Sequence, residues 1–151
     1  MRNFINSRYT GSAPAHMWLG VSIENASTLA RLRHLKETHP AIRFVSFEPL
    51  LGPIGKVHLT GIHRVIVGGE SGAKFRDVDR QWVRQLRHQC IEQQVAFFFE
   101  QWGGRTSKAR GNRLDGRQWL QFPTLPQRAA DSGAVPRKGT GDPSAPIRPL
   151  A

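Results

Sequence analysis

The chain has 151 residues, a length typical of one compact domain. Its 22 Lys and Arg residues against 11 Asp and Glu residues give a formal net charge of +11 at pH 7. No stretch approaches the ~20 apolar residues that cross a bilayer, and the amino-terminal residues lack the apolar core of a secretory signal. One cysteine, Cys90, excludes an intramolecular disulfide and a cysteine-only metal site. We therefore expect a soluble cytoplasmic protein with no metal and no membrane partner.

The charge is spread unevenly along the chain. Residues 1–102 hold 13 basic and 8 acidic residues, a net charge of +5, whereas residues 103–151 hold 9 and 3, a net charge of +6. Six of the ten prolines lie from Pro123 onward, in a segment without apolar periodicity. Such a segment cannot bury enough apolar surface to offset the ~1–2 kcal/mol of backbone entropy lost per ordered residue. We predict an N-terminal arm over 1–13, a folded unit over 14–123 and a disordered basic tail over 124–151.

The first half of the folded unit alternates between apolar runs and a helical pattern. The run MWLGVSI over 17–23 predicts a buried strand, and IRFVSF over 42–47 predicts a second one. Between them, Ser27 is a candidate N-cap for a helix that runs to about Thr38 and carries leucines on one face. Pro40 follows at a position where it would stop this helix.

The second half repeats the pattern. The run IHRVIV over 62–67 predicts a third strand, Asp79 caps a helix to about Gln93, and VAFFF over 95–99 predicts a fourth strand. We expect Trp18, Trp82 and the three phenylalanines at 97–99 to lie in the core. Near-continuous apolar strands separated by helices are typical of parallel sheets. The fold class is therefore α/β, either a partial (β/α) barrel or an open parallel sheet with flanking helices.

Each predicted strand ends on a glutamate. Glu24, Glu48, Glu70 and Glu100 follow one another at intervals of 24, 22 and 30 residues, close to the length of one β/α unit. Because the carboxyl ends of parallel strands share one edge of a sheet, the four carboxylates could converge there. Such a cluster would raise carboxyl pKa values and favour a cation, an amine or acid–base chemistry. The alternative is that each is an ordinary loop acid bound to backbone amides or to a nearby arginine.

Two glycine-rich loops are candidates for contact with anions. The cluster GGESG over 68–72 follows the third strand and either presents N–H groups to an anion or forms a tight turn. The segment 103–117 is basic. It either contacts nucleic acid or another polyanion, or it is a solvated loop without a ligand. The nucleic-acid-binding candidates in it are Arg105, Lys108, Arg110, Arg113 and Arg117. Trp102 lies just before this segment and is a candidate to stack on a ligand.

Four motifs in order carry a resemblance to a known family. They are MWLGVSIEN over 17–25, RFVSFEPLLGP over 43–53, VIVGGESG over 65–72 and FFFEQWGG over 97–104. Together they resemble the C-terminal half of the phage Gp thirty-seven/Gp sixty-eight family of uncharacterised, radical-SAM-like proteins, over about residues 13–123. That family pattern is expected to carry lysine where Glu100 stands. The resemblance thus implies Glu24, Glu48 and Glu70 as site-facing residues, with Ser71, Gln101 and Trp102 as secondary candidates and the catalytic residues unknown.

The resemblance also implies what this chain lacks. The N-terminal half of the relatives carries three clustered cysteines on a partial (β/α) barrel, which implies a [4Fe–4S] cluster and S-adenosylmethionine for full-length relatives only. With Cys90 alone, we expect no cofactor in this chain and no catalysis by it in isolation. Half a barrel would leave two sheet edges open, so we expect a separate N-terminal half or a three-cysteine-motif protein as partner. The alternative function is a nucleic-acid or polyanion-binding module that uses the basic loop and tail.

Overall fold

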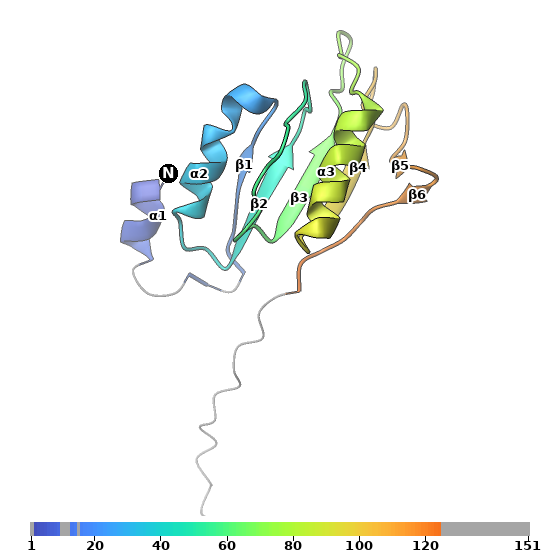
Figure 1. Cartoon of the computed structure of the whole chain (residues 1–151). Coiled ribbons are helices and arrows are strands. Elements are labelled where there is room, and N and C mark those ends of the chain that lie inside the picture. The colour runs from blue at the N-terminus through green and yellow to red at the C-terminus, as the bar shows by residue number, and fades with distance from the viewer. Residues whose placement is uncertain (1, 10–12, 15, 125–151) are drawn as a thin grey trace, which may run out of the picture.

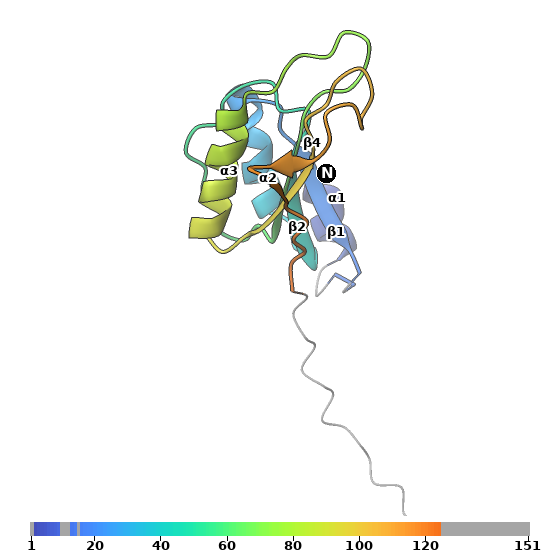
Figure 2. The same cartoon turned by 90° about the vertical axis from the view of Figure 1, so that its right-hand side faces the viewer.

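A computed structural model describes residues 2–9, 13–14 and 16–124. Four strands form one parallel sheet in the order β1–β2–β3–β4, and helices α2 and α3 cover one of its faces (Figures 1 and 2). The elements are α1 (Arg2–Arg8), β1 (Trp18–Ser22), the 3-10 turn η1 (Ala26–Thr28), α2 (Ala30–Lys36), β2 (Ile42–Phe47), β3 (Arg64–Gly68), α3 (Arg80–Glu92), β4 (Ala96–Gln101), β5 (Arg113–Leu114) and β6 (Arg117–Gln118). The predicted α/β class with a parallel sheet and flanking helices is confirmed. Within the described residues the sheet is open rather than closed into a barrel, and residues 125–151 of the predicted tail lie outside them.

The predicted bounds of the four parallel strands and of α3 agree with the structure to within two residues, whereas the helix predicted from Ser27 to about Thr38 begins later. Helix α1 and the hairpin of β5 and β6 were not predicted. Asp79 caps α3 as predicted, because its side chain accepts a hydrogen bond from the amide of Gln81 at 2.7 Å. The predicted cap Ser27 is wrong: Asn25 accepts from the amide of Ser27 at 2.9 Å and opens η1, so that α2 begins only at Ala30. The asparagine side chain satisfies the amide two residues ahead, which favours a tight turn over a continuous helix.

The core lies between the sheet and the two helices. Alternate residues of β2, β3 and β4 point into it and are fully buried: Val45, Phe47, Val65, Val67, Phe97 and Phe99. Leu35 of α2 and Leu86 of α3 meet them from the helix side. Burying one such side chain stabilises the fold by about 1.5–3 kcal/mol. The prediction of a core position is wrong for Trp18, which is 36% exposed, and for Phe98, because the strand alternation places both side chains on the opposite face of the sheet.

Gln89 of α3 and Gln93, the C-cap residue of that helix, hold the extended segment that precedes β3. Gln89 accepts from the amide of Val57 at 2.7 Å and donates to the carbonyl of Gly55 at 2.9 Å. One turn later, Gln93 accepts from the amide of Leu59 at 2.7 Å and donates to the carbonyl of Val57 at 3.0 Å. The side-chain amides thus act as a neighbouring strand would, satisfying backbone groups that packing removes from water.

The two outer strands have different edges. The segment after β6 runs antiparallel along β4: the amide of Phe99 donates to the carbonyl of Trp119 at 2.8 Å, and the amide of Gln121 donates to that of Phe97 at 3.2 Å. No described residue forms a strand pair with the outer edge of β1. Helix α1 lies on that side of the molecule, where Asn6 donates to the carbonyl of Glu37 at 2.9 Å (Figure 1). The expectation of two open edges is therefore wrong for β4.

Candidate functional site

One face of the sheet carries no helix in the described part of the chain (Figure 2). We call it the open face. Its residues alternate with the core positions and include Trp18, Gly20, Ser22, Phe44, Ser46, Arg64, Ile66, Phe98 and Glu100. The ring of Phe44 lies directly over Gly20, in the space that a larger side chain would need. In parallel α/β folds, ligands bind at the carboxyl ends of the strands. The open face near those ends is thus the first place to look for a site.

Glu48 and Glu100 form a carboxyl pair at this end of the open face. Glu48 follows β2 directly, Glu100 belongs to β4, and Gly68 of β3 lies between them. A Cβ atom at position 68 would lie 2.7 Å from Oε1 of Glu48, so the missing side chain is the space that this carboxylate fills. Burial and the neighbouring Glu100 carboxyl raise the pKa of Glu48 to about 7. We call Glu48 and Glu100 the acid pair.

The raised pKa determines what the acid pair can do. A carboxyl group with a pKa near neutrality is populated in both protonation states at physiological pH. It can therefore donate a proton to a ligand or accept one, a property common at functional sites. The sequence reasoning set Glu100 aside, yet it is the glutamate that the structure brings beside Glu48.

Arg64 is the third charged residue of the open face, and the sequence reasoning missed it. It is 7% exposed, and its guanidinium lies 4.3 Å from the ring centre of Phe98 and 3.8 Å from that of Phe122. Its Nε has no hydrogen-bond partner within the described residues. Burial lowers the pKa of Arg64, and the charge of Glu100 opposes this shift. The available signal was a single arginine inside the apolar run of the third strand.

Glu24 and Glu70 do not lie with the acid pair but form local ion pairs. Oε1 of Glu24 lies 3.0 Å from Nη1 of Arg31. Burial raises the pKa of Glu24, but the hydrogen bond from Arg31 and further contacts outweigh this effect, so the pKa of Glu24 is lowered overall. Arg76 binds Glu70 through Nε at 2.8 Å and through Nη2 at 2.7 Å, which lowers the pKa of Glu70 to about 2. For these two residues the structure favours the alternative of loop acids paired with a nearby arginine.

The glycine cluster over 68–72 packs against the chain that leaves β4. The amide of Gly69 donates to the carbonyl of Gln101, and that of Gly72 donates to the carbonyl of Gly104, both at 2.9 Å. The side chain of Gln101 donates to Oγ of Ser71 at 3.2 Å. A Cβ atom on Gly69 would overlap the backbone of the neighbouring segment. Two of the amides predicted as candidates for an anion are thus used inside the fold, which favours the structural alternative for this cluster over anion contact.

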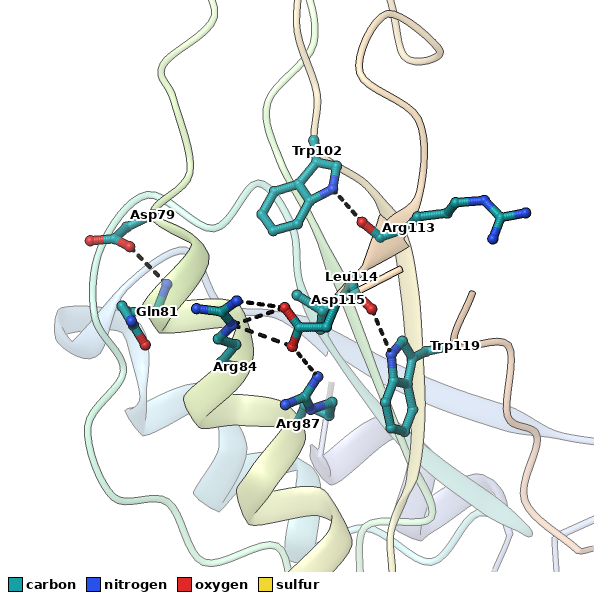
Figure 3. Close-up of polar contacts among 9 residues, drawn as sticks. All are labelled: Asp79, Gln81, Arg84, Arg87, Trp102, Arg113, Leu114, Asp115 and Trp119. Carbon is teal, nitrogen blue, oxygen red and sulfur yellow. Dashed lines mark hydrogen bonds and ion pairs between the residues drawn. The ribbon is translucent and has the colours of Figure 1, made fainter. Parts of the chain in front are cut away.

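Trp102 lies beyond β4 on the helix side of the sheet. Its indole N–H donates to the carbonyl of Arg113 at 2.9 Å (Figure 3), and its ring centre lies 4.7 Å from that of Phe99. The guanidinium of Arg80, the first residue of α3, lies 4.8 Å from the indole. A cavity of about 350 Å³ opens here, lined by Val78, Arg80, Trp102, Arg110 and Arg113.

The basic candidates of the loop have different surroundings. Arg105 and Lys108 are exposed, whereas Arg110 forms an ion pair with Asp77. Arg113 donates to the carbonyl of Gly116 at 2.9 Å, and Arg117 lies 3.8 Å from the ring centre of Trp119. All five side chains are exposed, and they differ in whether a partner within the fold holds them.

An ion-pair cluster fixes the hairpin of β5 and β6 to α3. Asp115 lies 2.6 Å from Arg84 and 2.7 Å from Arg87 (Figure 3). Hydrogen bonds from these two arginines lower the pKa of Asp115 to about 2. The contact holds the segment 113–122 in the position from which it covers β4.

The residues present do not fit an iron–sulfur cluster. Cys90 is fully buried in α3, and burial raises the pKa of its thiol to about 12, which disfavours the thiolate that binds metal. The described ranges contain no group of three or more His, Cys, Asp or Glu residues placed to hold a metal ion. No helix in these ranges is long and apolar enough to span a membrane.

Comparisons with known proteins give one match. No curated protein and no solved structure matches the chain. A family profile described as "Protein of unknown function (DUF5131)" matches residues 1–123. The matched range includes the whole sheet, both covering helices and the segment along β4. The chain belongs to this family of proteins of unknown function, DUF5131.

Proposed function

We propose that the chain supplies the C-terminal strands and an acid–base carboxyl pair to a larger parallel α/β site, which a further strand completes along the free edge of β1. The difference between the two sheet edges carries this proposal. Residues 119–121 bind the edge of β4, whereas no described residue pairs with that of β1. The run 17–23 contains neither a charged residue nor proline, two of the features by which proteins protect an edge strand. Such an edge is suited to accept another strand.

The hydrogen bonds of β1 identify the groups that face this edge. The carbonyl of Met17 accepts from Ile42, and the amide of Ile23 donates to Ser46, so odd-numbered residues bind β2. In a parallel pair, alternate residues direct their N–H and C=O groups to opposite sides. The amides of Gly20 and Ser22 therefore face outward, where a partner strand could accept from them. The outward carbonyl of Ser22 already accepts from Nη1 of Arg31 at 2.8 Å.

The partner we propose is a radical-SAM-like N-terminal half, either part of a longer chain or separately encoded. Its three cysteines would hold the [4Fe–4S] cluster, since this chain has a single cysteine, and that half would also bind S-adenosylmethionine. Closing the sheet would enclose the open face and remove the acid pair further from water. Glu48 would then be a group that gives a proton to a bound substrate or takes one from it.

Blocking the edge of β1 tests this proposal. The chain would be co-expressed with the polypeptide encoded directly upstream of it, and complex formation measured by co-purification. Ser22→Pro removes an amide that faces the edge and leaves the amides that bind β2. We expect Ser22→Pro to lose the partner and Ser22→Ala, the matched control, to keep it. Equal capture of the partner by both variants would contradict the proposal.

An assay of the chain alone tests the assignment of the cofactors. After anaerobic incubation with iron and sulfide, we expect no 5′-deoxyadenosine from S-adenosylmethionine, because the described residues offer no set of three thiolates. Deoxyadenosine production that depends on this chain alone would show that the cluster site lies within it.

A second candidate function is the binding of nucleic acid or another polyanion. The exposed Arg105 and Lys108 favour it, since flexible basic loops contact phosphates readily. Because residues 113–122 belong to the fold, the informative variants are a truncation after Thr124 and the double substitution of Arg105 and Lys108 by Gln. We expect a steep salt dependence of DNA and RNA affinity that these variants reduce. Unchanged affinity in both variants would exclude this function.

A further inference from the structure

We infer that the cavity between the first turn of α3 and the basic loop is a binding site for the phosphate group of a small ligand. We call it the arginine–tryptophan pocket; it measures about 350 Å³ and is lined by Val78, Arg80, Trp102, Arg110 and Arg113. It lies on the helix side of the sheet, because Trp102 packs on the core residue Phe99. The inference is therefore independent of the acid pair and of the edge of β1.

Two guanidinium groups supply the positive charge of the pocket. Arg80 lies against Trp102 and has no carboxylate partner within the described residues. Arg110 lies 4.7 Å from the ring centre of Phe75 and pairs with Asp77, whose side chain is 70% exposed. An ion pair with so exposed a carboxylate contributes little, so an incoming phosphate can replace it. Planar guanidinium groups match the oxygens of a phosphate through paired hydrogen bonds.

Trp102 gives the pocket a fixed wall. The hydrogen bond to the carbonyl of Arg113 and the edge contact with Phe99 hold the indole in one orientation. The side chain of Arg113 points away from Trp102 (Figure 3) and donates to Gly116, so that Arg113 adds no charge beside the indole. No residue that lines the cavity is acidic.

The place of the pocket in the fold also favours an anion. It lies beyond the carboxyl end of β4, the side on which parallel sheets bind ligands. Its wall includes Arg80, the first residue of helix α3. Because the Asp79 carboxylate already caps the N-terminus of α3, the positive charge at the cavity comes from the arginine side chains rather than from the helix terminus. The guanidinium charge and the rigid indole wall thus act on the same cavity.

The chain offers a matched control that separates a pocket from diffuse attraction. Arg105 belongs to the same basic loop, is exposed and does not line the cavity. Substitution of Arg105, Arg80 or Arg110 by Gln removes one positive charge in each case. If the pocket binds the anion, Arg80→Gln and Arg110→Gln lower the affinity more than Arg105→Gln does. If the loop attracts anions through its general positive charge, all three substitutions lower the affinity equally.

The experiment titrates the full chain with inorganic pyrophosphate by calorimetry. We expect one saturable site, an affinity about tenfold lower in Arg80→Gln and in Arg110→Gln, and a change below about twofold in Arg105→Gln. Arg80→Lys, which keeps the charge without the planar fork, serves if Arg80→Gln does not fold, and we expect a smaller loss. Equal losses in Arg80→Gln, Arg110→Gln and Arg105→Gln, or no saturable binding by the folded chain, would overturn the inference.

A second readout reports the pocket directly. The indole N–H resonance of Trp102, assigned from its loss in Trp102→Phe, is expected to shift on addition of pyrophosphate while those of the other tryptophans stay in place. Binding that leaves the Trp102 resonance unchanged would place the anion elsewhere and overturn the inference.

Discussion

The carboxylate of Glu48 lies over Gly68, where a Cβ atom would be 2.7 Å from its Oε1. This close approach lets a residue that follows β2 reach across β3 to Glu100 on β4. Glycine at position 68 is thus the structural condition for the acid pair.

Gly68→Ala is expected to separate the acid pair. The added methyl group must displace the Glu48 carboxylate, which takes it away from Glu100 and toward solvent. The pKa of Glu48, about 7 in the native chain, should fall toward its ordinary value of 4.5. A carboxyl-carbon NMR titration measures this, with Ser46→Ala on the same face as control. An unchanged pKa of Glu48 in Gly68→Ala would show that Glu48 does not depend on this space.

The acid pair also predicts how stability depends on pH. The folded state holds the Glu48 proton up to about pH 7, whereas the unfolded chain releases it near 4.5. The free energy of unfolding therefore falls as the pH rises from 4.5 to 7, by about 1–2 kcal/mol once solvent screening of this half-exposed group is included. Denaturant unfolding at pH 5, 6, 7 and 8 measures the slope.

Two variants isolate the contribution of Glu48. Glu48→Gln should remove the part of the pH dependence of the unfolding free energy that Glu48 causes. Glu70→Gln should leave that pH dependence unchanged above pH 5, because the pKa of Glu70 is about 2. His63 acts in the opposite direction, since burial and the charge of Arg43 lower its pKa and favour the neutral ring in the folded state. Because His63 is present in every variant, it cancels in the differences. A slope that Glu48→Gln does not change would contradict the raised pKa.

Gln93→Ala is expected to lower the free energy of unfolding by about 1–3 kcal/mol, because it leaves the amide of Leu59 and the carbonyl of Val57 without their partner. Gln85 lies on the same helix, is exposed and makes no such contact. Gln85→Ala should thus change stability by less than about 0.5 kcal/mol. If Gln93→Ala and Gln85→Ala lowered the free energy of unfolding equally in urea denaturation, the Gln93 contacts would not stabilise the segment that precedes β3.

Proline substitutions test the cover over β4. Gln121→Pro removes the amide that binds the carbonyl of Phe97, together with the side chain that accepts from the amide of Phe97. We expect a loss of about 2–3 kcal/mol and self-association through the exposed edge, seen by sedimentation. Leu120→Pro is the control, because the amide of Leu120 points away from β4 in this antiparallel pair. A monomeric Gln121→Pro variant of native stability would contradict the covering role.

The parts of the fold set by local sequence could be predicted. Apolar runs marked the four strands, and Asp79 marked the start of α3. The hairpin of β5 and β6 had a signal that was missed: Asp115 and Gly116, both with positive φ, form the two-residue turn typical of Asp-Gly. The segment that follows has no such local signal, since it is held by tertiary contacts with β4.

The candidate site depends on tertiary contacts that the spacing of the glutamates along the sequence does not reveal. Four glutamates end four strands, but Arg31 and Arg76 bind two of them, and only the gap at Gly68 brings Glu48 to Glu100. Which carboxylates meet is decided by strand order and by where the arginines fold. The spacing could predict a shared edge but not the pair.

Hydrogen exchange of the β1 amides, in the chain alone and in complex with the polypeptide encoded upstream, tests most directly whether the edge of β1 accepts a strand. The outward amides of Gly20 and Ser22 should exchange rapidly in the chain alone and slowly in the complex, while the inward amide of Ile23 should be protected in both. Equal exchange of Gly20 and Ser22 in the two states would contradict the account.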